Sequence, residues 1–171
     1  YKMAMADVFV ILANVDFEKN NFQNRYFLNT KDKWVTKSVN SERGKIIEKI
    51  YADGSSLMVV NMMWISAIKE TLGIKTKIVF DYATYLKGTE RLINIIKHYD
   101  GTTYLTNPAA KDKYLDEEMM KNAGIDIEYV KVPKNLQKHI FEIFEELGID
   151  GAIKHLPIES KEEKLCENLK I

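Results

Sequence analysis

The sequence predicts an α/β fold, in which a Rossmann-like, mainly parallel sheet is flanked by helices, with an antiparallel hairpin insertion over about residues 25–51. Short apolar runs, typical of strands buried on both faces, alternate with helical segments of about 10–15 residues. Strands separated by such helices form right-handed parallel βαβ units. The polar turns in the insertion break this alternation, which favours antiparallel pairing there.

The parallel strands are expected at residues 7–13, 76–81, 102–106 and 125–132. The first is a nearly continuous apolar run rich in β-branched residues. Residues 25–29 and 33–39 alternate apolar and polar side chains around a polar turn, which predicts the hairpin. Residues 45–51 are expected to add a third strand to it.

Four helices are expected at residues 55–72, 89–99, 108–122 and 136–147. The first follows Ser55 and Ser56, which suit a helix cap, and stops at Gly73. It is apolar on almost all sides, so it is either deeply buried or an interface between copies of the chain.

These elements predict a single α/β domain over residues 1–156, followed by a charged tail or peripheral helix at 157–171. Position 1 is Tyr, and a strand begins only a few residues later. A strand or loop is therefore expected to precede this sequence in the natural protein.

Composition narrows the class of protein. The 171 residues are 46% hydrophobic, and 25 Lys and Arg balance 25 Asp and Glu. This neutrality disfavours a protein that binds mainly to the phosphate backbone of nucleic acid. Cys166 is the single cysteine and the three histidines are scattered, so no metal site is indicated. No apolar run is long enough to span a membrane and no signal peptide is evident, which predicts a cytoplasmic protein.

The sequence also lacks the glycine-rich phosphate-binding motifs and the Gly-x-Ser-x-Gly motif. A P-loop kinase, a standard dinucleotide-dependent dehydrogenase and an α/β-hydrolase are therefore disfavoured. No particular cofactor is indicated.

Two strand-to-helix junctions have the character of an anion site, because ligands bind beyond the carboxyl ends of parallel strands. At the first, Gly88 permits close approach of the backbone, Thr89 suits a cap, and Arg91 adds positive charge near the helix start. At the second, Asn107 suits a cap and Lys111 could reach a ligand. Each is also readable as an ordinary helix start. On neighbouring strands, the two junctions would converge on one pocket.

A third candidate is the polar segment after the first strand, which includes Asn24. Here Glu18 is expected to act as a general base, while Lys19 and Arg25 would hold a phosphate or a developing negative charge. A hydrophilic surface loop is the alternative. The predicted catalytic residues are thus Glu18 and Lys19, and the predicted ligand-binding residues are Asn24, Arg25, Gly88, Thr89, Arg91, Asn107 and Lys111.

The order of several short motifs resembles the WbqC-like family over residues 1 to about 150. In the first half these are Ala6-Asp7-Val8-Phe9-Val10-Ile11, Phe17-Glu18-Lys19, Gln23-Asn24-Arg25 and Trp34-x-Thr36. In the second half they are Leu72-Gly73-Ile74, Thr89-Glu90-Arg91-Leu92 and the run from Tyr104 to Leu115 around Asn107-Pro108-Ala109-Ala110-Lys111-Asp112.

This resemblance implies a role in bacterial surface-polysaccharide biosynthesis, because members of that family occur in gene clusters for O-antigen and similar glycans, beside sugar-nucleotide enzymes. It suggests an enzyme acting on a nucleotide-activated sugar, such as an acyl- or aminoacyl-type transferase. Members usually open with a strand and a Gln-Pro-x-Tyr-x-Pro-Trp loop, which would lie before Tyr1. At Thr106-Asn107 they more often carry Ser-Gly.

Two alternatives stay open. One is a non-catalytic binding or scaffold module that dimerises or docks a partner enzyme through the apolar helix at 56–72. The other is a transferase that acts on nucleotides or modified bases. The partner expected from the sequence is a small anionic ligand such as a nucleotide sugar, with association of copies of the chain as a further expectation and no membrane span.

Overall fold

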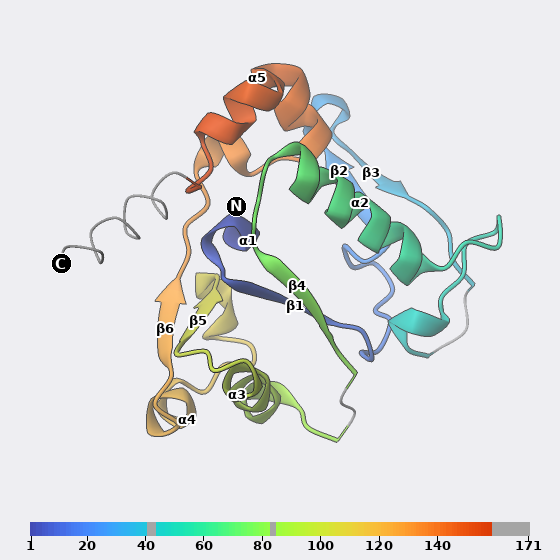
Figure 1. Ribbon diagram of the computed structural model, residues 1–171. Helices are drawn as coiled ribbons and strands as arrows, with labels where there is room; N and C mark the ends of the chain where they lie inside the picture. The colour runs from blue at the N-terminus through green and yellow to red at the C-terminus, as the bar shows by residue number, and fades with distance from the viewer. Residues whose placement is uncertain (41–43, 83–84, 159–171) are drawn as a thin grey trace.

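A computed structural model describes residues 1–40, 44–82 and 85–158. It confirms the α/β class, with parallel strand pairs, one antiparallel pair and flanking helices (Figure 1). The predicted tail at 157–171 lies outside the described residues from position 159 onward.

The parallel strands form two separate pairs. Strand β1 (Val8–Leu12) pairs with β4 (Lys77–Asp81), and β5 (Thr103–Thr106) pairs with β6 (Asp126–Tyr129). Within the part of the chain described, no ladder joins the two pairs, so the single four-stranded Rossmann-like sheet expected from the sequence is not formed. Local patterns identified the strands but could not identify their neighbours, because pairing depends on hydrogen bonds between distant segments.

The hairpin is formed by β2 (Arg25–Leu28) and β3 (Lys33–Thr36), as predicted, with a 3₁₀ turn at Asn29–Lys31 between them. The prediction of a third strand at 45–51 is wrong. A 3₁₀ helix occupies Ile46–Glu48, because the Glu48 carboxylate accepts a hydrogen bond from the Lys45 N–H at 2.8 Å and turns the chain. Isolated antiparallel bridges link Val39 to Tyr51 and Ile50 to Ser56.

The helices are α1 (Lys2–Met5), α2 (Leu57–Thr71), α3 (Gly88–His98), α4 (Glu117–Asn122) and α5 (Ile140–Lys154). Ser56 holds the cap position of α2 without a side-chain cap bond. The helix expected at 108–122 is split into a 3₁₀ turn at Pro108–Ala110 and α4, whose true cap is Asp116. The last helix begins later and runs further than predicted, and Gly148, at φ 68°, bends it.

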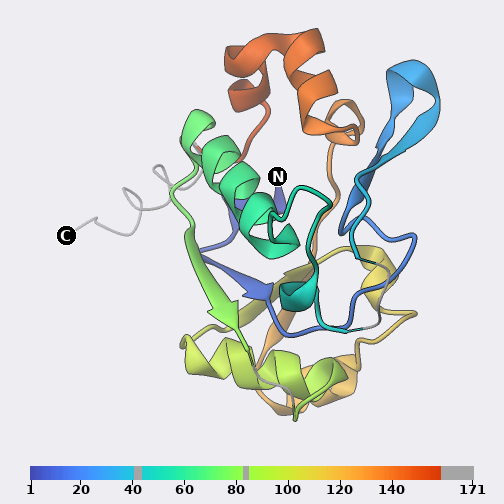
Figure 2. The same ribbon diagram turned by 90° about the vertical axis from the view of Figure 1, so that its right-hand side faces the viewer.

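Two hydrophobic clusters hold the elements in place. One joins α1, the end of α2 and α5 through the buried residues Ala4, Leu72, Ile74, Ile143 and Ala152. The other joins α3, α4, β5 and β6 around the fully buried Met120. Figures 1 and 2 accordingly draw α2, α5 and the hairpin toward one end of the molecule and α3 and α4 at the other.

Candidate functional site

The carboxyl ends of β1 and β4 lie at one edge, where the loops after both strands meet. The Asn14 side chain donates a hydrogen bond to the Tyr82 carbonyl at 3.2 Å. Two residues further on, Asp16 forms an ion pair with Lys45 at 2.7 Å. The hydrogen bond and charge of Lys45, together with the charge of Lys87 just before α3, lower the pKa of Asp16. The start of α3 therefore lies close enough for the charge of Lys87 to affect Asp16 electrostatically.

Arg91 ties α3 to the end of β4. Its Nε donates a hydrogen bond to Asp81 Oδ2 at 2.6 Å, and the two side chains are only 10% and 16% exposed. Nη2 of Arg91 is buried and makes no hydrogen bond within the described residues. This guanidinium therefore has an unused donor beside the first turn of the helix.

Within the described residues, which do not include 83–84, no side chain caps the first turn of α3. Lys87 occupies the cap position and cannot accept a hydrogen bond, while Gly88 begins the helix at φ 53°. Thr89, predicted as the cap, instead donates to the Tyr114 carbonyl at 2.9 Å and accepts from the Asp116 N–H at 2.8 Å. Amides at an uncapped helix start, reinforced by the helix dipole, favour an anion. Both Lys87 and Gly88 are exposed, so an anion can reach them.

A second polar cluster lies at the carboxyl ends of β5 and β6. Glu117 accepts hydrogen bonds from the Tyr129 hydroxyl at 2.5 Å and pairs with Lys111 at 2.9 Å. These contacts lower the pKa of Glu117, the Tyr129 bond most, and raise the pKa of Tyr129 to about 12. The same carboxylate raises the pKa of Lys111. Asn107, the other predicted residue here, is exposed and makes no side-chain cap bond.

The two bonds of Thr89 join these clusters, because they fasten the start of α3 to residues 114–116. The structure therefore brings together the segments that carry Gly88, Thr89, Arg91 and Lys111. It also adds Glu117 and Tyr129, which the sequence did not single out. No local pattern marks them, since their partners come from other elements.

The segment after β1 is held by its own hydrogen bonds. Glu18 is exposed, and its carboxylate accepts a hydrogen bond from Asn21 at 2.5 Å. Asn24 donates to the Lys37 carbonyl at 2.8 Å across the hairpin. Arg25 donates to the Asn20 carbonyl and lies over the Trp34 ring, 4.1 Å from its centroid. Lys19 is exposed.

Arg25 is thus part of the hairpin, and Figures 1 and 2 draw the hairpin and α3 at different ends of the molecule. Of the cations predicted to hold one anion, Arg91 and Lys111 lie on segments that meet, whereas Arg25 is bound to the hairpin's own tryptophan.

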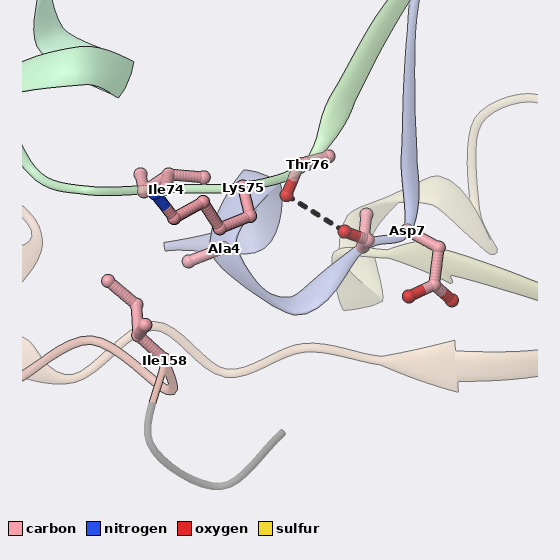
Figure 3. A pocket seen from close by; sticks show the side chains of 7 residues that line it. Ala4, Asp7, Ile74, Lys75, Thr76 and Ile158 are labelled. Carbon is pink, nitrogen blue, oxygen red and sulfur yellow. Dashed lines mark hydrogen bonds between the residues drawn. The ribbon is translucent and has the colours of Figure 1, made fainter. Parts of the chain in front are cut away.

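A hollow of about 240 Å³ opens at the other, amino-terminal edge of β1 and β4 (Figure 3). Its lining is largely apolar, with Ala4, Ile74 and Ile158, and Asp7 lies at its side. The Thr76 hydroxyl bonds the Ala6 carbonyl at 2.8 Å. Because ligands of parallel sheets bind at the carboxyl edge, this hollow is not the site that the strand order favours.

The described residues contain no group of three or more His, Cys, Asp or Glu side chains that could hold a metal ion. Nor is any helix of the described chain both long and apolar enough to cross a membrane.

Comparison with known proteins gives one finding. The model of the WbqC-like protein family matches residues 1–53 and 40–146. No curated protein and no solved structure matches the chain.

Proposed function

The chain belongs to the WbqC-like protein family, and we propose that it is an enzyme of bacterial surface-glycan biosynthesis that acts on a nucleotide-activated sugar. The reaction class proposed is transfer of an acyl or aminoacyl group to that sugar. The single observation that carries the proposal is the start of α3, where no side chain of the described residues caps the helix and the buried Arg91 guanidinium lies close by.

A nucleotide sugar contains a pyrophosphate, which needs hydrogen-bond donors and positive charge. The first amides of α3 and the helix dipole supply both, and exposed Lys87 adds a cation. Gly88 at φ 53° leaves open space above the backbone: apart from its chain neighbours and the helix's own backbone, no atom of the described residues lies within 4 Å of where a side chain would begin. A phosphate can therefore approach the amides closely.

Arg91 is suited to a steady supporting role. Its pair with Asp81 fixes the guanidinium and largely cancels its charge, so Arg91 offers a preorganised N–H donor, Nη2, without the entropy loss of an exposed side chain. In group transfer, such fixed donors also stabilise an oxygen on which negative charge develops. Glu18 is the proposed general base for the accepting hydroxyl or amine, with Lys19 beside it.

The test is a thermal-shift titration with UDP-glucose, UDP-N-acetylglucosamine, dTDP-glucose and GDP-mannose. At least one is expected to raise the melting temperature, and the rise should shrink in Lys87→Ala and in Arg91→Lys. Lys97→Ala is the matched control, because Lys97 lies in the last turn of the same helix. An absence of any shift, or a shift of equal size in all variants, would contradict the proposal.

One observation favours a second candidate, a scaffold that docks through α2. Val59, Met63 and Trp64 are each more than half exposed and lie within a helix whose charged residues are confined to its last turn. Contiguous exposed apolar side chains mark interaction surfaces. Light scattering tests this candidate: a molar mass that rises with concentration, and returns to 19.8 kDa in Met63→Glu, would favour it.

A further inference from the structure

The hairpin has two faces with different surroundings. Side chains alternate along β2, so Tyr26 points one way and its neighbours Arg25 and Phe27 the other. Tyr26 stacks on His139 at the start of α5, with ring centroids 4.1 Å apart. Trp34 pairs with Phe27 across the ladder and shares its face. One face therefore packs on the protein, and the opposite face carries two aromatic rings and an arginine.

Phe22, from the preceding loop, joins this second face. Its ring centroid lies 5.2 Å from that of Trp34, with the planes tilted by 56°, and Phe27 meets Trp34 nearly edge-on at 5.4 Å. Phe22 is 72% exposed and Trp34 is 44% exposed. We call Phe22, Arg25, Phe27 and Trp34 the hairpin patch. The exposed rings of Phe22 and Trp34 lie side by side at a tilt and present their surfaces to solvent.

The loop that carries Phe22 is ordered by its own bonds. The Glu18 N–H donates to Gln23 Oε1 at 2.9 Å, and the Phe22 N–H donates to Asn21 Oδ1 at 2.6 Å. Arg25 closes the loop through the Asn20 carbonyl. These bonds hold the Phe22 ring toward solvent, although burial of an aromatic ring is favoured. Ordered, exposed aromatic side chains beside an arginine are typical of binding surfaces.

Charge around the hairpin patch indicates the sign of a ligand. Residues 18–33 carry four cations, Lys19, Arg25, Lys31 and Lys33, against the two carboxylates Glu18 and Asp32, and of the cations Lys33 lies on the hairpin face opposite Trp34. The whole chain is neutral, so this excess of positive charge is local. It attracts an anionic partner to the aromatic surface.

We propose that the hairpin patch binds a ring of an acidic saccharide, that is, a pyranose bearing a carboxylate. The flat C–H face of such a ring packs on Phe22 and Trp34, and the hairpin cations attract the carboxylate. The choice of a saccharide rests on the proposed function, since a glycan-modifying enzyme must hold an acceptor as well as an activated donor. The hairpin patch lies apart from the start of α3, so it is a second subsite.

The test uses Trp34 as the reporter. The chain has two tryptophans, so Trp64→Phe leaves fluorescence from Trp34 alone. Titration of this protein with trigalacturonate is expected to change the emission saturably, with binding that weakens as salt is added. Phe22→Ala should raise the dissociation constant about tenfold or more. Tyr85→Ala is the matched control, because it removes an equally exposed ring elsewhere and should change nothing.

Other outcomes overturn the inference. Maltotriose binding as tightly as trigalacturonate would remove the role of charge, and equal affinity in Phe22→Ala would remove the role of the rings. Preferential quenching by uridine monophosphate would assign the hairpin patch to a nucleobase instead. If trigalacturonate does not bind but nucleotide sugars still raise the melting temperature through Lys87, this inference fails and the proposed function stands. If trigalacturonate binds through Phe22 but no nucleotide sugar raises the melting temperature, the proposed function fails and the saccharide subsite stands.

Discussion

The side-chain hydroxyl of Thr89, in the first turn of α3, accepts a hydrogen bond from the backbone N–H of Asp116 at 2.8 Å. The same hydroxyl donates to the Tyr114 carbonyl, and Thr89 is buried. One side chain thereby joins the helix that follows β4 to the loop that follows β5.

Replacement of Thr89 by Val should lower the free energy of unfolding by about 1–2 kcal/mol, because both bonds are lost while the shape is kept. Thr89→Ser retains the hydroxyl and should lose less. Urea denaturation measures both variants. A Thr89→Val variant as stable as the natural chain, or less destabilised than Thr89→Ser, would show that the hydrogen bonds of the hydroxyl are not responsible.

The buried pair of Arg91 and Asp81 gives a second prediction. Arg91→Met should lower the free energy of unfolding by about 3 kcal/mol, because the largely buried Asp81 carboxylate loses its ion pair with Arg91. Adding Asp81→Asn to that variant should restore part of the loss. Lys138→Met, which breaks the more exposed pair with Glu146, should cost less than about 1 kcal/mol. A double variant less stable than Arg91→Met alone would contradict this account.

Glu142 predicts a pH-dependent contact between α5 and the hairpin. Its buried carboxylate accepts hydrogen bonds from the Thr30 N–H at 2.7 Å and the Asn29 side chain at 2.9 Å. These bonds, the backbone bond to Thr30 first, lower the pKa of Glu142 to about 2. Because the folded pKa lies below the unfolded value of about 4.3, the stabilisation is full above that value and is lost as the pH falls toward 2.

Glu142→Gln should therefore lower the denaturation midpoint most at pH 6–7, and its difference from the natural chain should shrink between about pH 4.3 and 2. Glu145→Gln, three residues along and exposed, is the control and should change little. A difference that stays constant across this range would show that the ionised carboxylate is not responsible.

A prediction at Gly88 tests stability and the proposed ligand binding together. At φ 53°, Gly88→Ala should cost about 1–2 kcal/mol in backbone strain and turn the amides of the helix start away from a ligand. Gly54→Ala is the matched control, because Gly54 also has a positive φ and open space but lies outside the junction. Both variants should lose stability in denaturant, and only Gly88→Ala should weaken nucleotide-sugar binding in the thermal-shift titration. Equal binding in both would separate Gly88 from the anion site.

The residues at the start of α3 show what the sequence could and could not predict about the proposed anion site. Sequence placed a glycine and an arginine at the start of α3, since these residue types have recognisable uses at a helix start. It assigned the wrong task to Thr89, because capping is judged from local sequence and the actual partners of Thr89 are 25 and 27 residues away. Arg25 shows the same limit. It was predicted to hold an anion, but in the structure its guanidinium lies over the ring of Trp34 on the facing strand of the hairpin.

By itself, the sequence determined where strands and helices form and which family the chain belongs to, because side-chain periodicity and short ordered motifs are local properties. Tertiary structure alone decided that the parallel strands form two pairs rather than one sheet. It also turned the segment at 46–48 into a 3₁₀ helix and placed Arg25 over the Trp34 ring of the hairpin. The reason is physical: a backbone or charged group binds whichever partner the packed chain brings within about 3 Å, and sequence spacing does not specify that partner.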